Sequence, residues 1–359
     1  MSLGDPLSFS RGRPMKNRFM LAPLTNTQSH ADGVLSDDEF HWLTMRAKGG
    51  FGLTMTCAAH VQEVGQGFPG QLGAWGDHQL AGLARLAAAI RAEDSLAVVQ
   101  LHHAGNRSPA DLIGATPVCP SDDPDTGARA LSTAEVEQLV EDFVQGAERA
   151  EKAGFDGVEL HGAHGYILSQ FFSAKINRRD DAYGGDLDNR FRILFEIIDG
   201  VRSRCGADFQ LGLRLSPERF GLQLAEIKQM AERLMTGGAL DYLDMSLWDC
   251  FKLPVEEAHQ DKSLLHHFVE LPRGNTRLGV AGKIRAPEDA QAVLDAGVDW
   301  VMLGRAAILH HDFPQRCLSG EDFEPVAPPV SPEHLKAEGL SDTFVSYMKS
   351  SFKGFVADG

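Results

Sequence analysis

The segment HGAHGY at residues 161–166 holds the densest group of side chains able to do chemistry. It brings two imidazoles, His161 and His164, close to the phenol of Tyr166. The glycines between them allow sharp turns, so the three side chains can gather at one point. Two imidazoles and a phenol can together bind a carbonyl oxygen and deliver a proton. The pattern therefore predicts acid–base chemistry on a carbonyl compound.

Two other interpretations of these histidines stay open. A His-x-x-His spacing can ligate a metal, but here it falls at the end of a predicted strand rather than on one helix face, and no third ligand is clearly placed. A purely structural role for both rings is the second alternative. The neighbouring pair His102 and His103 is less persuasive, and we expect at least one of them to serve packing.

Eight short apolar runs must position these groups, and most are followed by a helical pattern. Near-continuous apolar runs are typical of parallel strands covered by helices. The alternation predicts a single (β/α)8 TIM barrel in the α/β class. The runs are Arg18–Leu24, Gly52–Val61, Leu96–His103, Gly157–His161, Gln210–Ser216, Leu240–Ser246, Arg277–Ile284 and Trp300–Arg305.

Helix signals separate the runs. Ser36 precedes a segment with acidic residues in its first turn, Ser132 heads a segment with apolar residues at helical spacing, and Pro287 stands where a first helical turn begins. An open, doubly wound sheet is the structural alternative, but no glycine-rich dinucleotide loop follows the first run.

The composition changes at Pro325, where the proline-rich stretch PVAPPVSPEH begins. We therefore predict a cofactor-binding barrel over residues 1–324 and a C-terminal extension with a short helix over residues 325–359. Ser341 can cap that helix, with Phe344, Met348 and Phe352 at helical spacing on one face. Such a stripe is too short to be stable alone, so we expect it to dock on the barrel or on a neighbouring subunit.

In a TIM barrel, functional groups lie at the C-terminal ends of the strands, and phosphates bind after the last two. Glycines there let backbone N–H groups approach an anion, and an arginine adds a bidentate donor. This rim suits a flat, polar, phosphate-bearing cofactor, although the last arginine could form a structural ion pair and the glutamine could be a core amide. The candidate cofactor residues are Ala22, Pro23, Leu24, Thr25, Ala58, Gln100, His161, Arg214, Gly282, Gly304 and Arg305.

The formal net charge of −16 disfavours nucleic acid and anionic membranes as partners. The five cysteines are scattered without a C-x-x-C motif, which predicts reduced thiols in the cytoplasm and neither a disulfide framework nor an iron–sulfur cluster. No apolar run reaches the ~20 residues of a membrane span, and no signal-peptide core begins the chain. We expect a small-molecule substrate and, from the extension, a possible homo-oligomer.

Several stretches together resemble the old yellow enzyme family of FMN-dependent ene-reductases. They are NRFMLAPLT (17–25), QLHHAG (100–105), AGFDGVELHGAHGYILSQFFS (153–173), NRRDDAYGGDLDNRFR (177–192) and LGR (303–305). The resemblance implies that FMN lies across Pro23, Thr25, Ala58, Gln100 and Arg214, with its phosphate at Gly282, Gly304 and Arg305. It also implies that His161 and His164 bind a substrate carbonyl oxygen and that Tyr166 donates the proton.

The activity implied by this resemblance is a ping-pong reaction, in which NADH or NADPH supplies electrons that reduce the C=C bond of an α,β-unsaturated carbonyl compound. Two alternatives stay open: an FMN-dependent amine dehydrogenase or demethylase, and a flavin-free barrel lyase. Two departures from the family pattern bear on the substrate. Thr27 stands where some relatives carry a tyrosine, and Asn106 stands where arginine is usual.

Overall fold

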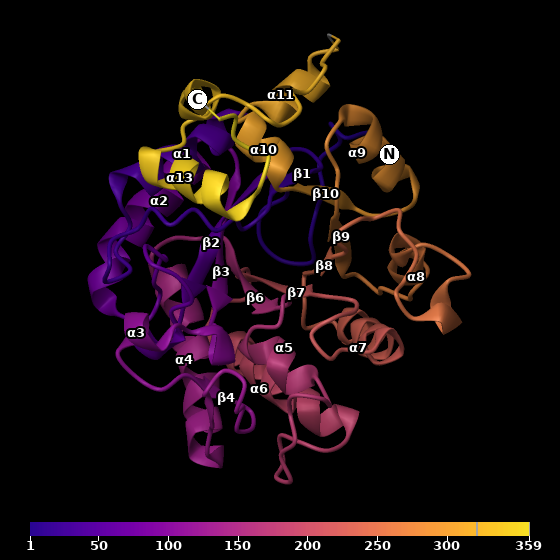
Figure 1. Cartoon of the computed structure of the whole chain (residues 1–359). Coiled ribbons are helices and arrows are strands. Elements are labelled where there is room, and N and C mark those ends of the chain that lie inside the picture. Colours follow the sequence, from indigo (N-terminus) through magenta and orange to yellow (C-terminus); the bar gives the residue numbers. More distant parts are fainter. Residues whose placement is uncertain (321, 359) are drawn as a thin grey trace.

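A computed structural model describes residues 1–320 and 322–358. Eight parallel strands form a closed barrel in the order β1-β10-β9-β8-β7-β6-β3-β2 (Figure 1). This confirms the predicted TIM barrel, and each of the eight apolar runs coincides with one strand, with β6 extending one residue beyond its run. The strands are β1 (Phe19–Leu21), β2 (Leu53–His60), β3 (Leu96–His102), β6 (Gly157–Gly162), β7 (Gln210–Leu215), β8 (Tyr242–Ser246), β9 (Arg277–Ala281) and β10 (Trp300–Leu303).

The helices around the barrel begin at the predicted caps. Ser36 Oγ accepts a hydrogen bond from the Glu39 N–H, and Ser132 forms a capping box with Glu135. The helices are α1 (Asp37–Lys48), α2 (Leu80–Ala92), α3 (Ala110–Ile113), α4 (Thr133–Lys152), α5 (Ile167–Phe172), α6 (Leu187–Arg204), α7 (Leu224–Thr236), α8 (Leu264–Val269), α9 (Pro287–Asp295), α10 (Arg305–Leu309), α11 (Phe313–Leu318), α12 (Pro332–Ala337) and α13 (Asp342–Ser351). A small separate sheet pairs β4 (Val118–Cys119) with β5 (Arg129–Ala130).

The alternating directions of the strand side chains create two apolar cores. A smaller cluster, which includes Met20, Met55 and Trp300, lies apart from a large cluster that joins the strands to the surrounding helices. Fixing the strands from both sides holds their C-terminal ends in a defined arrangement, which is what a site built on several strands requires.

The predicted end of the last strand was wrong. β10 stops at Leu303, and Arg305 is the first residue of α10 rather than the last of the strand. Gly304 has φ −100° and ψ −93°, outside the strand region, and its carbonyl accepts a helical hydrogen bond from the Ile308 N–H. Gly282 likewise follows β9 instead of lying on it.

Helix α13, drawn in yellow in Figure 1, lies beside α1. Phe344 and Met348 are buried, and Phe344 packs edge-on against Trp42 of α1. The prediction that Phe352 shares this buried face was wrong. The helix ends at Ser351, where the chain turns away, and Phe352 is 37% exposed. The boundary at residue 325 between a barrel domain and an extension stays a prediction.

Within residues 1–320 and 322–358, no helix combines the length and the apolar character needed to cross a bilayer. All five cysteines are free thiols.

Candidate active site

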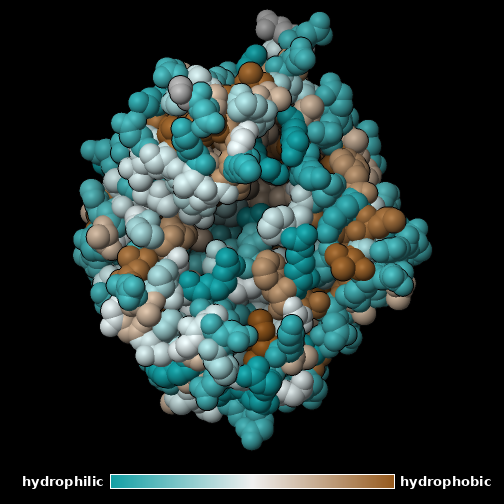
Figure 2. Space-filling model, viewed as in Figure 1, coloured by the Kyte–Doolittle hydropathy of each residue, from teal (hydrophilic) through white to brown (hydrophobic). Residues whose placement is uncertain are grey.

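A cavity of about 730 Å³ opens at the C-terminal ends of the barrel strands. Figure 2 shows this face of the molecule with a hollow near its centre, bordered largely by hydrophilic residues. Every residue that the sequence singled out for catalysis or cofactor binding lines this one cavity. They are Ala22, Pro23, Leu24, Thr25, Ala58, Gln100, His161, His164, Tyr166, Arg214, Gly282, Gly304 and Arg305.

The two histidines form a hydrogen-bonded chain that begins at the end of β6. The Ala163 N–H donates to His161 Nδ1 (3.3 Å), so the proton of that ring sits on Nε2. His161 Nε2 then donates to His164 Nδ1 (3.3 Å), and His164 Nε2 donates to Ser246 Oγ (2.7 Å). At 3.3 Å the bond between the rings is longer than the bond to Ser246, so an incoming carbonyl oxygen can replace it at a lower cost.

Burial keeps both rings neutral. Removal from water is the main cause that lowers the pKa of His161 well below its usual value, and the neighbouring His164 adds to it. Burial also lowers the pKa of His164, with further contributions from Arg214 and Arg107. Neutral rings with fixed tautomers can donate hydrogen bonds to a carbonyl oxygen without exchanging protons with solvent near pH 7.

Tyr166 is held by its ring and leaves its hydroxyl available. His102 contacts the ring edge-on at 4.4 Å between centroids, and the Arg107 guanidinium lies 4.5 Å from its centroid. Arg107 is itself fixed by donating to the His164 carbonyl oxygen at 2.6 Å. In the part of the chain that the structure describes, the Tyr166 hydroxyl makes no hydrogen bond to another residue. It can therefore donate to a ligand.

The histidines at 102 and 103 do not line the cavity. Both are buried, with His102 Nδ1 at 3.0 Å from Gln71 Nε2 and His103 Nε2 at 3.1 Å from Gln62 Oε1. His103 packs in a loop, whereas His102 supports the Tyr166 ring.

A buried polar layer lies behind the cavity. Arg214 is 6% exposed, its Nη2 donates to Ser246 Oγ (3.3 Å), and its Nε has no partner. Gln100 Nε2 donates to Glu159 Oε1 (2.7 Å). Burial raises the pKa of Glu159, and it raises that of Asp244 well above the usual range, where the neighbouring Glu159 carboxylate acts in the same direction. Both carboxyls therefore keep their protons to higher pH than exposed acids do, because burial, and at Asp244 also the charge of Glu159, opposes ionisation opposite Arg214.

The lining of the cavity is strongly cationic, although the whole chain carries −16. Among the described residues, no aspartate or glutamate lines it, while these cations do: Arg107, Arg214, Arg219, Lys283, Arg285 and Arg305. Such a lining concentrates anions.

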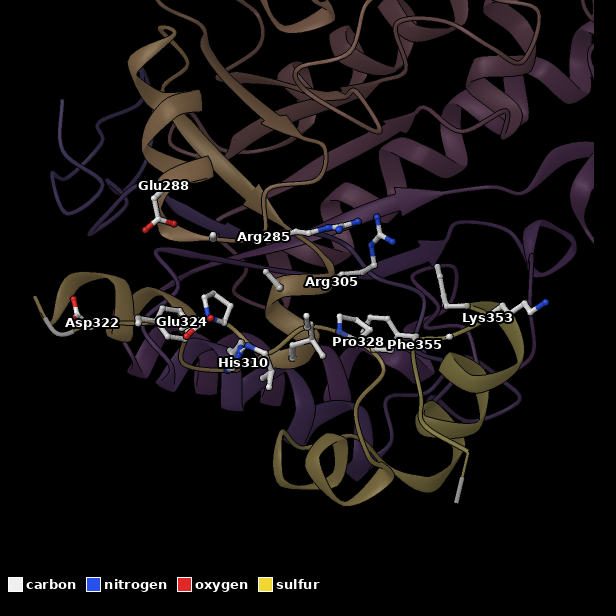
Figure 3. Close-up of a pocket in the computed structure, with 18 residues that line it drawn as sticks. Arg285, Glu288, Arg305, His310, Asp322, Glu324, Pro328, Lys353 and Phe355 are labelled. Carbon is white, nitrogen blue, oxygen red and sulfur yellow. Dashed lines mark hydrogen bonds between the residues drawn. The ribbon is translucent and has the colours of Figure 1, made fainter.

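Arg285 and Arg305 mark the anion-binding end. Figure 3 shows their side chains extending into the same space, and the charge of Arg285 contributes to lowering the pKa of Arg305, after burial. Within the described residues neither guanidinium has a carboxylate within ion-pair distance. Two adjacent unpaired arginines fit a phosphate. A second cavity of about 850 Å³ adjoins this end and shares both arginines with the first.

Sequence reasoning missed several lining residues. Ser246 ends β8, and its polar type at a strand end was a usable signal. Arg285 follows β9 by a few residues and could have been identified from the sequence in the same way. Arg219 and Trp248, which stack with 4.6 Å between guanidinium and ring centroid, lie in long loops. Tyr347 comes from α13, and no local pattern could have placed it here.

No group of three His, Cys, Asp or Glu side chains able to hold a metal occurs in residues 1–320 and 322–358.

The sequence model of the NADH:flavin oxidoreductase / NADH oxidase family matches residues 2–323. The chain belongs to this family. Its resemblance to old yellow enzymes is thereby confirmed. This flavin oxidoreductase uses FMN, with NADH or NADPH as reductant, which sets aside a flavin-free lyase. The side chains fit that cofactor, because Arg214 Nε has no hydrogen-bond partner and could donate to a polar ring edge, while Arg285 and Arg305 have no carboxylate partner and could bind a phosphate.

Curated relatives and solved structures agree with this assignment. The probable NADH-dependent flavin oxidoreductase YqiG of Bacillus subtilis (strain 168) is 35% identical over 331 residues, covering 89% of this chain and 88% of that protein. An NADH:fumarate oxidoreductase of Klebsiella pneumoniae (strain 342) is also 35% identical over 338 residues, but these cover 89% of this chain and 36% of that larger protein.

Among solved structures, the old yellow enzyme homologue from Zymomonas mobilis has a TM-score of 0.80 at 28% identity, covering 96% of this chain and 99% of that one. Morphinone reductase in complex with tetrahydroNAD has a TM-score of 0.78 at 28% identity, covering 96% and 97%.

Proposed function

We propose that this flavin oxidoreductase reduces the C=C bond of α,β-unsaturated carbonyl compounds at the expense of NADH or NADPH. The observation that carries the proposal is the convergence of neutral His161, neutral His164 and the free hydroxyl of Tyr166 on one cavity wall. Relatives named NADH:fumarate oxidoreductase, NADH:acrylate oxidoreductase and morphinone reductase support the same reaction class.

FMN would lie along the barrel mouth, with its ring near Pro23, Thr25, Ala58, Gln100 and Arg214 and its phosphate near Gly282, Gly304, Arg285 and Arg305. When bound, it supplies the redox chemistry, accepting two electrons from reduced nicotinamide and passing two to the substrate. Arg214 stabilises negative charge at the buried edge of that site, since its Nε has no hydrogen-bond partner of its own.

The substrate carbonyl oxygen accepts a hydrogen bond from His161 Nε2, replacing the 3.3 Å bond between the rings, and a second one from His164 Nε2 in place of its bond to Ser246 Oγ. These donors withdraw electrons from the conjugated system and prepare the β-carbon for reduction. Tyr166 then gives its proton to the α-carbon. Arg107, 4.5 Å above the phenol, stabilises the phenolate that remains. The reductant and the enone occupy the same cavity in turn, which makes the kinetics ping-pong.

The charge of the cavity argues against amine oxidation. A cationic lining repels a protonated amine, and the described lining holds arginines and a lysine but no aspartate or glutamate to offset that repulsion.

Anaerobic titration of the purified protein tests the function. NADH or NADPH should bleach the flavin absorbance, and 2-cyclohexenone should restore it within the time of one catalytic turnover. A secondary or tertiary amine should not bleach the oxidised protein. If the amine bleaches the flavin absorbance and enones do not restore it, the protein is an amine dehydrogenase and not an enone reductase.

A cytoplasmic location is also part of this proposal, since all five thiols are free. A homo-oligomer is proposed only as a possible state.

A further inference from the structure

The cofactor accounts for only part of the positive charge in the cavity lining. Its phosphate fits the two adjacent arginines at the anion-binding end, and its ring fits the buried arginine behind the cavity. Lys283 is neutralised by an ion pair with Asp249, 2.8 Å from Nζ to Oδ2. Arg107 and Arg219 remain, and within the described part of the chain neither has a carboxylate at ion-pair distance. The cavity therefore holds two cations that FMN does not use.

Both of these cations approach the segment that carries the two cavity histidines. Arg107 donates to the His164 carbonyl oxygen at 2.6 Å. Arg219 reaches the same segment through its neighbour, because the Phe220 ring packs on Gly165 so closely that a Cβ there would lie 2.6 Å from Phe220 Cδ1. The two guanidiniums therefore belong to the end of the cavity where the substrate carbonyl binds, and not to the phosphate end.

The backbone that carries Arg219 is strained. Arg219 has φ 70° and Phe220 has φ 54°, so two consecutive bulky residues lie in the left-handed region. Such conformations cost free energy and persist mainly where the surrounding structure fixes them, often at functional sites. Here the Leu222 N–H closes the turn by donating to the Arg219 carbonyl oxygen at 2.8 Å. The turn thereby directs the Arg219 side chain to the cavity rim.

Stacking orients the Arg219 guanidinium and leaves its donors available. The guanidinium lies 4.6 Å from the centroid of the Trp248 ring, which also lines the cavity. Among the residues that the structure describes, it makes no hydrogen bond or ion pair. A planar guanidinium whose face is covered and whose edge is free matches a carboxylate, which can accept two parallel hydrogen bonds.

The histidine pair accommodates the substrate carbonyl oxygen, so an anion at Arg219 belongs to another part of the same molecule. We propose that the substrate is an unsaturated ketone that also carries a carboxylate, and that Arg219 is the specificity-determining residue that binds this carboxylate. The charge of Arg107 adds to the attraction. This inference rests on the proposed enone-reductase function and gives its substrate class.

Reduced nicotinamide cofactors are a second source of negative charge, because their pyrophosphate enters the same cavity. The substrate is favoured over the reductant because Arg219 belongs to the turn that packs on Gly165, beside the group that holds the carbonyl oxygen. Measuring the binding of both kinds of ligand separates the two sources.

Two ligands of the same shape provide the test. trans-3-Benzoylacrylate carries a ketone, a C=C bond and a carboxylate, and trans-3-benzoylacrylamide is its neutral amide. Their dissociation constants are measured on the oxidised holoenzyme from the change in flavin absorbance, without turnover. The wild type should bind the acid more tightly than the amide. Arg219→Gln should raise the constant for the acid about 3- to 10-fold, the effect of one partly exposed charge-assisted contact, and change that for the amide less than twofold.

Two further measurements identify charge as the cause. Arg219→Lys keeps the positive charge and should retain part of the preference for the acid. Raising the salt concentration from about 0.05 M to about 0.5 M should weaken binding of the acid to the wild type, and much less to Arg219→Gln. Arg233→Gln is the matched control, because that guanidinium also stacks on a ring, 4.5 Å from Phe195, but lies away from the cavity. It should leave both constants unchanged.

Three results would overturn the carboxylate contact. They are equal binding of acid and amide by the wild type, equal weakening of both by Arg219→Gln, and no change for either. If Arg219→Gln instead raises only the NADH concentration needed to bleach the flavin, the arginine binds the pyrophosphate of the reductant. Failure of 2-cyclohexenone to restore absorbance that NADH has bleached would overturn the enone-reductase function itself.

Discussion

The ring of Phe344 packs edge-on against Trp42 at 5.3 Å between centroids, joining α13 to the first helix of the barrel. Both side chains are fully buried. Phe344→Ala should remove about 3–5 kcal/mol from the docking of α13, the usual loss for a buried phenylalanine.

Limited proteolysis between residues 325 and 358 should therefore accelerate in this variant, while bound FMN is retained. Leu318→Ala, at a residue 42% exposed, serves as the control and should leave the cleavage rate unchanged. Unaltered proteolysis in Phe344→Ala would show that other contacts hold the helix.

Arg305→Ala should weaken FMN binding by roughly 1–3 kcal/mol, the contribution of a charge-assisted hydrogen bond. Arg285→Ala should weaken it similarly, because the two guanidiniums share one space. Fluorescence titration of released and rebound FMN gives these values. Arg129→Ala, at a distant arginine paired with Glu135, is the control. Unchanged affinity in both single variants would place the phosphate elsewhere.

Tyr166→Phe keeps the ring contacts with His102 and Arg107 and removes only the hydroxyl. Bleaching of the flavin by NADH or NADPH should stay near the wild-type rate. Recovery of the absorbance with an enone should slow by roughly 10²–10⁴, the contribution of a positioned general acid. Rapid mixing separates the two phases. If both phases slow equally, the residue has a structural role, and if neither slows, another group supplies the proton.

The neutral histidine pair predicts a flat pH profile for ligand binding. Burial lowers the pKa of His161 and of His164, so both rings stay unprotonated across the range near pH 6.5 where an exposed histidine titrates. The dissociation constant of isophorone should therefore change less than twofold between pH 6 and pH 8. A titration centred near pH 6.5 would mean that at least one ring is solvated in solution.

Asp244 predicts how stability depends on pH. Its pKa is raised in the folded protein, whereas an unfolded aspartate has a pKa of about 4. Between these two pKa values the folded state binds more protons than the unfolded state. The contribution of Asp244 to the free energy of unfolding is therefore complete below pH 4 and is lost as pH rises toward the raised pKa. Asp244→Asn mimics the protonated acid and does not titrate. Its free energy of unfolding should therefore rise relative to that of the wild type by about 1.4 kcal/mol per pH unit in that window.

Denaturant unfolding at pH 5, 6 and 7 measures this gain. Asp241→Asn is the control, since that buried aspartate is paired with Arg11 and Arg202 and its replacement should destabilise the protein. A constant difference between Asp244→Asn and the wild type at all three values would mean that Asp244 is ionised in the folded state.

The sequence was sufficient to predict the barrel and the residues around its mouth, because both follow from local patterns. Apolar runs indicate strands, and parallel strands bring their C-terminal residues to one edge, which is why Ala58, Gln100 and Arg214 could be placed together without a structure. The end of β10 was misplaced because Gly304 and Arg305 continue an apolar run without belonging to the strand.

The rest depends on long-range packing. The spacing of Phe344 and Met348 indicated a docking face but carried no information on its partner, which is Trp42. Tyr347 consequently could not be assigned to the cavity. The raised pKa of Asp244 was equally hidden, since it arises from burial beside Glu159 on another strand.

The closure of the barrel has a consequence for how the protein is made. β1 pairs with β2 and with β10, and Phe19 is aligned with Val301. One edge of the first strand therefore stays unpaired during synthesis until the last strand of the barrel has been made. Until then Phe19, Met20 and Leu21 present an unsatisfied apolar edge, the kind of surface that invites association between nascent chains. Ribosomal pausing before β10 emerges should therefore favour aggregation, and chaperone binding should be strongest to chains interrupted in that interval.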